Sequence, residues 1–427
     1  MNQAQSLFIG IDLGTSGVRA CAINSDEELL HTSSTSLPSP DIHQQSITQD
    51  ARLWWQATQS VLNELLKNID ASQVWAISVN GTSGTVLACD QQGAPLAPAR
   101  MYNDGFCTKQ TKRISDIAPV TSAAHGTSSG LAKLLYLQES CPEAKHFLHQ
   151  ADWIVGQLTG KFNITDENNA LKSGYDPINT CWPEWLNQLH IKLENLPKVV
   201  PPGTPVAAIQ NGLFKELNLN PQCQVISGTT DSIAAFIATG ASRPGDAVTS
   251  LGSTLVLKVI SDTPISAPEY GIYSHRLGNY WLAGGASNTG GAVLKHYFTQ
   301  QKMDQLTPLL SPEHPTGLNY YPLIQAGERF PTNDPTLPPK LKPKADSELQ
   351  FFQAMLEGIS NIEFAAYQKL HQLGAPYPSI IESAGGGSHN AAWIKMRQSI
   401  LGVAVKQAKF SEACYGSALL AKRGFYN

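Results

Sequence analysis

Two segments far apart in the sequence share one pattern, and this repetition limits the folds open to the chain. "IGIDLGTSGVRACAIN" (9–24) contains an apolar strand, a Gly-Thr-Ser-Gly turn and a second apolar strand, and "DAVTSLGSTLVLKVIS" (246–261) repeats that order around Leu-Gly-Ser-Thr. A repeated unit of this kind predicts two domains built on one plan, which meet at a central cleft. We expect the boundary near Ser242, with domains at 1–242 and 243–427.

The remaining pattern predicts an α/β architecture. Asp50 can cap a helix whose apolar residues recur at helical spacing as far as Leu66. Further strands are predicted at 74–79 and 85–88, and further helices at 131–137, 153–158 and 349–373. Strands that alternate with helices in this way indicate a layered α/β fold.

Composition excludes several classes of protein. The 427 residues carry a formal net charge of −4, which gives no electrostatic footprint for nucleic acid or an anionic membrane. Seven scattered cysteines lack the spacing of a zinc site and fit free thiols in a reducing compartment. We find no secretory leader and no apolar window long enough to span a membrane, so we expect a cytoplasmic protein with small-molecule partners.

The glycine turns are the first candidate sites. Glycine with Ser or Thr lets a backbone bend tightly and present N–H and O–H donors to a phosphate. The turns at Gly14-Thr15-Ser16-Gly17 and Gly252-Ser253-Thr254 could hold one polyphosphate from opposite domains. An ordinary hairpin turn is the structural alternative for each.

Two carboxylates accompany these turns. Asp12 is unusual in a purely structural hairpin, because a carboxylate beside a phosphate repels it unless a cation such as Mg²⁺ lies between them. Asp231 follows Gly228-Thr229-Thr230 and opens an apolar helix. It is either a helix cap or the group that accepts a proton from an attacking hydroxyl during phosphoryl transfer.

Other catalytic signatures are absent from the sequence. The chain has no Gly-x4-Gly-Lys-Ser/Thr loop, no Gly-x-Gly-x-x-Gly after its first strand and no Gly-x-Ser-x-Gly elbow. These absences disfavour a P-loop, a Rossmann dinucleotide site and a serine hydrolase. His389 in "GGGSHN" is interpreted as a loop residue rather than a metal ligand.

Taken together, the motifs resemble those of the FGGY family of carbohydrate kinases over nearly the whole chain. The segments that carry the resemblance are "GIDLGTSGVR" (10–19), "DWIVGQLTGKFNITDENNA" (152–170), "SGTTDSIAAFIATG" (227–240), "LGST" (251–254), "AGERFPTNDP" (326–335), "AGGGSHNAAW" (384–393) and "EACYGSALLA" (412–421). The resemblance implies two duplicated domains of the actin, hexokinase and ribonuclease H type. It also implies ATP and Mg²⁺ as cofactors.

The same resemblance implies roles for individual residues. Asp231 would be the catalytic base, and Asp12 would lie near Mg²⁺ and the sugar. The transferred phosphate would be held by Gly14, Thr15, Ser16, Gly17 and Arg19, with Gly252, Ser253 and Thr254 as the second phosphate turn. The nucleotide would be bordered by Gly290, Gly386, Gly387, Ser388 and Asn390.

The substrate side departs from the xylulokinase pattern. Many xylulokinases have Met-His-Gly where this chain has Asn80-Gly81-Thr82-Ser83-Gly84, and Trp-Asn-Asp where it has Tyr102-Asn103-Asp104. Loss of the histidine changes the hydrogen bonds offered to sugar hydroxyls. Thr82, Ser83 and Asp104 are the candidate sugar contacts, with turn chemistry as their structural alternative.

In length and in its Gly-Thr-Ser-Gly-Thr segment, the chain resembles the short xylulokinase-like D-ribulokinases of cyanobacteria and plants. We therefore expect phosphorylation of D-ribulose to D-ribulose 5-phosphate, with D-xylulose or a polyol as the alternative acceptor. A non-catalytic actin-like nucleotide sensor is the alternative of another class. A chaperone-type ATPase is disfavoured, and the sequence leaves open whether the protein is a monomer or a homodimer.

Overall fold

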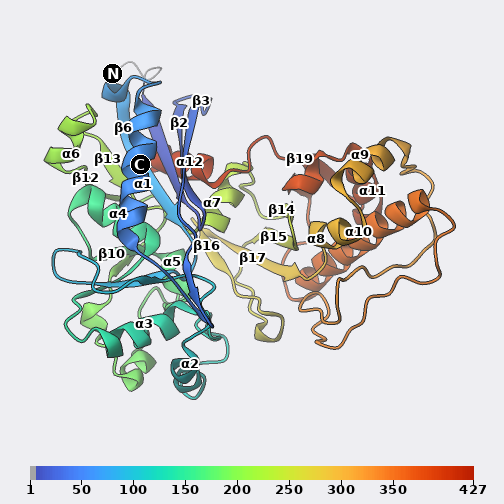
Figure 1. Cartoon of the computed structure of the whole chain (residues 1–427), viewed down its shortest axis with the longest axis horizontal. Helices are drawn as coiled ribbons and strands as arrows, with labels where there is room; N and C mark the ends of the chain where they lie inside the picture. The colour runs from blue at the N-terminus through green and yellow to red at the C-terminus, as the bar shows by residue number, and fades with distance from the viewer. Residues whose placement is uncertain (1–5) are drawn as a thin grey trace. The chain divides into compact units, whose positions relative to one another are not determined.

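The chain forms two compact units in a computed structural model that describes residues 6–427. Unit 1 contains the residues up to Ala238 together with Glu412–Asn427, and unit 2 is Thr239–Ser411. The expected boundary near Ser242 lies close to this division. The expected second domain, 243–427, differs at its end, because the last helix packs against the first strands of the chain within unit 1 (Figure 1).

The main sheet of unit 1 has the strand order β12-β13-β6-β1-β2-β3. Its strands are β1 (Leu7–Leu13), β2 (Gly17–Asn24), β3 (Leu29–Ser36), β6 (Val74–Gly81), β12 (Pro205–Ala208) and β13 (Gln224–Ile226). The strands β1, β2 and β3 pair antiparallel, whereas β6 pairs parallel with β1, and β13 pairs parallel with β6. The carboxyl ends of β1, β6 and β13 therefore lie at one edge of the sheet.

Helices cover this sheet, and smaller sheets extend the unit. The helices are α1 (Ala51–Leu66), α2 (Thr108–Ser115), α3 (Gly130–Ser140), α4 (Gln150–Thr159), α5 (Glu167–Leu171), α6 (Asn211–Glu216), α7 (Asp231–Ala238) and α12 (Ala413–Tyr426). A five-stranded sheet contains β4 (Asp41–His43), β5 (Ser46–Gln49), β7 (Val86–Cys89), β8 (Ala99–Arg100) and β9 (His146–His149), and a parallel pair contains β10 (Ile164–Asp166) and β11 (Lys198–Val200). As predicted, Asp50 caps α1 by accepting the Arg52 N–H.

The close approach of α12 to β1 and α7 depends on two glycines. A Cβ at Gly10 of β1 would lie 1.9 Å from the Cys414 carbonyl oxygen, and a Cβ at Gly416 would lie 1.8 Å from that of Ala234. Both distances are far below van der Waals contact, and both partners are backbone atoms. Only residues without a side chain allow the helix to lie this deep against the sheet.

Unit 2 repeats the plan of the main sheet. Its strand order is β16-β17-β15-β14-β18-β19, formed by β14 (Asp246–Leu251), β15 (Leu255–Ser261), β16 (His275–Leu277), β17 (Tyr280–Ser287), β18 (Ile380–Ala384) and β19 (Ala404–Gln407). Here β14, β15 and β17 pair antiparallel in turn, while β18 and β19 join β14 in parallel. The duplication predicted from the two strand-turn-strand segments is thus confirmed.

The helices of unit 2 are α8 (Gly291–Tyr297), α9 (Gln300–Leu306), α10 (Glu348–Gln372) and α11 (Ala391–Leu401). A fully buried ion pair lies between α10 and α11. The Arg397 Nε and Nη2 atoms each donate to Glu363 at 2.7 Å, and Arg397 Nη1 donates to the Ser383 hydroxyl of β18. Since Thr249 of β14 also donates to Glu363, at 2.6 Å, this network connects both helices to the two central strands.

All seven cysteines are free thiols. Across residues 6–427, no helix is both long and apolar enough to cross a membrane.

Candidate active site

The carboxyl ends of three parallel strands bring the predicted carboxylates of unit 1 together. Asp12 of β1 is opposite Asn80 of β6, and Gly81 forms a bridge with Thr230, directly before Asp231. Two segments distant in sequence, 12–17 and 228–231, therefore meet beside the turn after β6. This edge is where α/β proteins place their ligands.

Asp12 is partly buried, and three charged side chains affect its pKa. Burial, followed by the negative charge of Asp231, raises the pKa of Asp12 from its ordinary value to about 7. Glu412 also raises this pKa, whereas Arg19 lowers it. Two carboxylates close enough to repel each other are costly to ionise together unless a cation lies between them.

Asp231 is the first residue of α7. Its Oδ1 accepts the backbone N–H of Ser232 at 2.6 Å. A carboxylate at a strand end, beside a second one, has the chemistry to accept a proton from a hydroxyl.

The turn after β1 is tightly built. The Gly14 N–H donates to the Gly17 carbonyl at 2.9 Å, and the Leu37 N–H donates to the Ser16 carbonyl at 2.9 Å. Thr15 lies at the tip between them, and Ser16 is exposed. Arg19 is directed to Glu412, with 3.1 Å between Nη1 and Oε2, and both side chains are mostly exposed.

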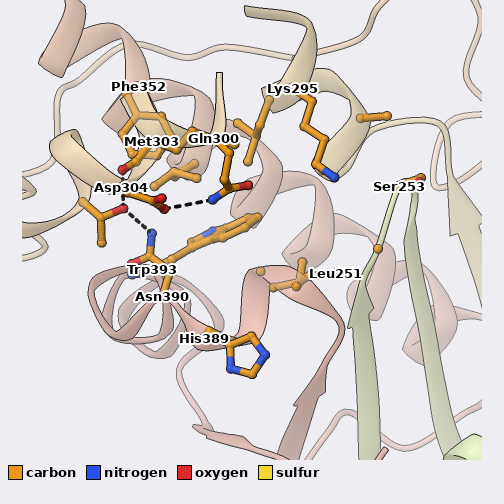
Figure 2. A pocket seen from close by; sticks show the side chains of 18 residues that line it. Leu251, Ser253, Lys295, Gln300, Met303, Asp304, Phe352, His389, Asn390 and Trp393 are labelled. Carbon is orange, nitrogen blue, oxygen red and sulfur yellow. Dashed lines mark hydrogen bonds between the residues drawn. The ribbon is translucent and has the colours of Figure 1, made fainter. Parts of the chain in front are cut away.

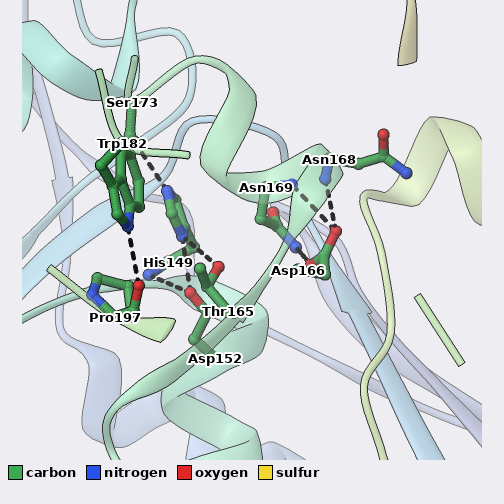
Figure 3. Close-up of polar contacts among 9 residues, drawn as sticks. All are labelled: His149, Asp152, Thr165, Asp166, Asn168, Asn169, Ser173, Trp182 and Pro197. Atoms are coloured by element: carbon green, nitrogen blue, oxygen red, sulfur yellow. Dashed lines mark hydrogen bonds and ion pairs between the residues drawn. The ribbon is translucent and has the colours of Figure 1, made fainter. Parts of the chain in front are cut away.

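A buried polar network supports the segment that carries Asp231. Asp166 caps α5 by accepting the N–H groups of Asn168 and Asn169, and the Asn168 side chain points away from it (Figure 3). The Asn168 amide donates to the Thr229 hydroxyl at 3.0 Å, within Gly-Thr-Thr-Asp. Burial, followed by repulsion from Asp152, raises the pKa of Asp166 to about 7.

His149 lies beside this network and forms buried hydrogen bonds of its own. Its Nδ1 lies 2.7 Å from Asp152 Oδ2 and its Nε2 lies 2.8 Å from the Ser173 hydroxyl (Figure 3). Both ring nitrogens therefore have partners inside the protein. His149 stabilises the junction of β9 and α4 and has no free nitrogen for chemistry.

The turn after β6 carries two of the predicted sugar contacts. The Thr82 N–H and hydroxyl both donate to Gln150 Oε1, at 2.9 and 2.8 Å. Four side-chain atoms around this turn and its neighbours are buried without a partner among the described residues: Asn80 Oδ1, Ser83 Oγ, Gln150 Nε2 and Thr230 Oγ1. Buried polar atoms of this kind are rare and call for a ligand or an ordered water.

Asp104, the third predicted sugar contact, is fully buried and already well bonded. It accepts the N–H groups of Ile47 and Phe106 at 2.8 and 3.0 Å, and forms an ion pair with Arg100 at 3.0 Å. The arrangement favours the alternative interpretation, in which Asp104 holds its own loop in place. Any contact with a sugar would use the remaining capacity of its oxygens.

Unit 2 contains a cavity of about 470 Å³ beside the second glycine turn. Five of the predicted residues line it: Gly252, Ser253, Gly386, Gly387 and Asn390. Figure 2 shows Ser253 and Lys295 on one side, and Asn390 with Trp393 on the other. Thr254, Gly290 and Ser388 do not line the cavity, and the Ser388 hydroxyl instead donates to the Gly385 carbonyl at 2.7 Å.

The glycines of "AGGGSHNAAW" have different structural roles. A Cβ at Gly387 would lie 2.7 Å from the Trp393 ring and 2.8 Å from Leu251, so its close packing requires glycine. Gly385 has a positive φ of 78°, and a Cβ there would lie 2.7 Å from the Leu251 carbonyl oxygen. Gly386 has open space around it and is the member of the three that is free to face a ligand.

Sequence reasoning missed much of the cavity wall. Met303, Phe352 and Leu356 supply apolar surface, and Gln300 donates to Asp304 at 2.9 Å at the rim (Figure 2). Lys295 and Trp393 contribute a cation and an aromatic ring. An apolar slot with a few polar groups is suited to a nucleoside. Trp393 ends the motif "AGGGSHNAAW", but nothing local in the sequence marks the other residues, because α8, α9 and α10 meet only in the fold.

Comparisons with known proteins agree with this geometry. Residues 7–238 match the family model described as "FGGY family of carbohydrate kinases, N-terminal domain", and residues 247–425 match the C-terminal domain of that family. A xylulose kinase of Staphylococcus epidermidis is 24% identical over 98% of this chain and 88% of its own length. A gluconokinase of Bacillus subtilis is 22% identical over 97% and 87%.

Solved structures show the same fold. A structure titled as a xyloylose kinase from Brucella ovis superposes with a TM-score of 0.87 at 23% identity, covering 98% of this chain and 90% of that one. A Plasmodium falciparum glycerol kinase solved with ADP has a TM-score of 0.84 at 17% identity, covering 97% and 89%.

Proposed function

Because the chain belongs to the FGGY family of carbohydrate kinases, it is a phosphotransferase of the sugar-kinase type, and we propose that it phosphorylates D-ribulose to D-ribulose 5-phosphate with ATP. The proposal assigns the acceptor to unit 1 and the nucleotide to unit 2. Within unit 1, the sugar hydroxyl and the transferred phosphate are contacted by Asp12, Asp231 and the turn at Gly14–Gly17. Within unit 2, the cavity beside Gly252 and Gly386 takes the nucleoside.

The chemistry follows from the two carboxylates. The terminal hydroxyl of the sugar attacks the γ-phosphorus, the new O–P bond forms as the bond from the γ-phosphorus to the bridging oxygen breaks, and ADP leaves. Asp231 accepts the hydroxyl proton. N–H and O–H donors of the turn at Gly14–Gly17 stabilise the charge on the transferred phosphoryl group.

The donor set of this edge is compatible with Mg²⁺. Magnesium binds proteins through one or two carboxylates and takes its remaining ligands from water and substrate phosphates. Asp12, whose pKa is raised by burial and by Asp231, is the residue that would hold it. When bound, the cation neutralises phosphate charge and favours the ionised form of Asp12.

The proposal of D-ribulose as the acceptor is based on the turn after β6. It presents the small hydroxyl side chains of Thr82 and Ser83 where many xylulokinases present a histidine. The Ser83 hydroxyl is buried and lacks a partner within the described residues, which supports a role in binding a sugar hydroxyl. D-xylulose is the second candidate, because several relatives are named as xylulose kinases.

The test is ADP release with Mg²⁺ and ATP across D-ribulose, L-ribulose, D-xylulose, glycerol and no sugar. We expect the highest kcat/KM with D-ribulose. A higher value with D-xylulose would replace the proposed acceptor. Nucleotide binding without any sugar-dependent release of ADP would favour a nucleotide sensor.

A matched pair of variants tests the turn itself. Ser83→Ala is expected to raise the KM for the preferred sugar by about tenfold, the effect of one lost hydrogen bond to a buried partner. Ser115→Ala, at an exposed position of α2, is the control and should leave KM unchanged. Equal KM values for Ser83→Ala and the wild type would show that Ser83 does not bind the sugar.

A further inference from the structure

Lys133 is a fully buried lysine that the chemistry above does not use. It lies in the first turns of α3, and its side chain is 0% exposed. Its Nζ donates to the carbonyl oxygens of Gly84 at 2.7 Å, Tyr102 at 3.0 Å and Ser128 at 2.9 Å. An ammonium group has three N–H donors, so all three have partners and no carboxylate is among them.

The three carbonyl groups belong to three separate loops. Gly84 follows Ser83 in the turn after β6, and Tyr102 lies in the loop that leads to Asp104. Ser128 precedes Ser129, which caps α3 by accepting the Ala132 N–H at 3.1 Å. Two of these loops carry Thr82, Ser83 and Asp104, the last of which holds the second loop in place through Ile47, Phe106 and Arg100. One cation therefore connects the parts of the acceptor site that the sequence leaves far apart.

We infer that Lys133 is a positioning residue for the acceptor site, whose ammonium group fixes the three loops through their carbonyl oxygens. The inference rests on the proposed function for the identity of that site. A neutral amine has only two N–H donors, so one loop loses its hydrogen bond when Lys133 loses its proton. An apolar side chain of the same length would release all three.

The surroundings of Lys133 place this change near neutral pH. Burial lowers its pKa to about 7, with Lys172 and Arg100 acting in the same direction and Asp104 and Cys107 opposing them. Arg100 comes from β8, Asp104 and Cys107 from the loop before α2, and Lys172 from the end of α5. Arg100 is paired with Asp104, so the ammonium group has no exclusive counter-ion.

Lys133→Met is the variant that tests the inference, because methionine keeps most of the volume and removes every donor. Its KM for the acceptor is expected to rise about 10- to 100-fold, the effect of misplacing a binding loop, while nucleotide affinity stays unchanged. Lys112→Met is the matched control, since Lys112 is an exposed lysine of α2 in the same unit. This control is expected to behave as the wild type.

The pH dependence separates positioning from general loss of structure. In the wild type, the KM for the acceptor should rise between pH 6 and 8, as Lys133 loses its proton. In Lys133→Met, the KM should be high and independent of pH over that range. A wild-type KM that does not change between pH 6 and 8, or a variant KM equal to that of the wild type, would overturn the inference.

Hydrogen exchange gives a readout that does not depend on turnover. In Lys133→Met, amides in 80–86, 100–106 and 124–130 should exchange faster than in the wild type at pH 6. If no sugar is phosphorylated, the proposed acceptor fails, and exchange in these three segments still decides the role of Lys133. If the variant does not fold, the wild-type exchange series from pH 6 to 8, corrected for intrinsic rates, decides it.

Discussion

At the scale of single residues, the two carboxylates of unit 1 could be predicted from the sequence because each lies in a local motif. Asp12 precedes a glycine turn, and Asp231 follows a strand and opens a helix. Lys133 could not be predicted, because its partners are backbone carbonyls of three distant loops. The same limit applies to Gln300 and Asp304, whose place at the cavity rim depends on how α9 packs.

Removal of the proposed base gives the first prediction. Asp231→Asn keeps the shape of the side chain but cannot accept the hydroxyl proton, so kcat for sugar phosphorylation should fall by about 10²- to 10⁴-fold. Nucleotide binding to unit 2, measured by calorimetry, should remain near the wild-type value. An Asp231→Asn enzyme with wild-type kcat would exclude Asp231 as the base.

The raised pKa of Asp12 gives a prediction about stability. Between its ordinary pKa of 3.8 and its folded value of about 7, the folded protein holds a proton that the unfolded chain releases. Stability from this group is present at low pH and is lost as pH rises through about 7. Asp12→Asn should therefore raise Tm by a few degrees at pH 8 in the absence of ligands, and the gain should shrink towards pH 4.

Thermal unfolding from pH 4 to pH 8 measures this difference. Asp26→Asn is the control, because Asp26 is exposed in the same unit, and its Tm should follow that of the wild type. A lower Tm for Asp12→Asn than for the wild type at pH 8 would contradict the prediction.

At the scale of elements, apolar periodicity was sufficient for the longer segments. The predicted helices at 131–137 and 153–158 are confirmed within α3 and α4, and the strand at 74–79 within β6. The predicted helix at 349–373 is confirmed as α10, which ends one residue earlier. Short strands such as β10 and β11 were missed, because three residues carry no periodic signal. Their pairing is decided by tertiary contacts rather than by local preference.

The packing of α12 against α7 gives a prediction about Gly416. Gly416→Ala places a Cβ 1.8 Å from a backbone oxygen that cannot rotate away, so it should lower the free energy of unfolding by at least about 2 kcal/mol. Gly212→Ala is the matched control, since Gly212 lies in α6 with open space around it. That control should be neutral or stabilising by up to about 1 kcal/mol in urea denaturation.

The buried ion pair of unit 2 gives a prediction about α10 and α11. Arg397→Met leaves the Glu363 carboxylate buried without its cation and should destabilise unit 2 by about 3–5 kcal/mol. Adding Glu363→Gln to that variant removes the uncompensated charge and should restore part of the loss. A double variant less stable than Arg397→Met, by denaturant unfolding, would show that charge is not the main cost.

At the scale of the whole molecule, the duplication could be predicted because both copies keep an apolar strand, a glycine turn and an apolar strand. The return of the last helix, α12, to unit 1 could not be predicted from the sequence. Residues 413–421 of α12 are all buried, and nothing in their apolar character selects one of two similar sheets. That choice depends on the close fit at Gly10 and Gly416.

Because the sugar is assigned to unit 1 and the nucleotide to unit 2, each ligand should protect the amides of its own unit from hydrogen exchange. A non-hydrolysable ATP analogue with Mg²⁺ should slow hydrogen exchange in unit 2 around 300–307 and 386–393, which line the cavity. The preferred sugar alone should slow exchange in unit 1 around 12–17 and 80–84. Protection of 80–84 by the nucleotide alone, with no change around the cavity, would reverse the assignment.

The position of α12 also has a consequence for synthesis on the ribosome. The strand β1 is made before unit 2, but the helix that covers it is made after all of unit 2. At about 5–20 residues per second, the interval spent on unit 2 alone is on the order of 10–30 s. During that time α12 does not cover Gly10, so the surface of nascent unit 1 against which α12 packs stays exposed until unit 2 has been made.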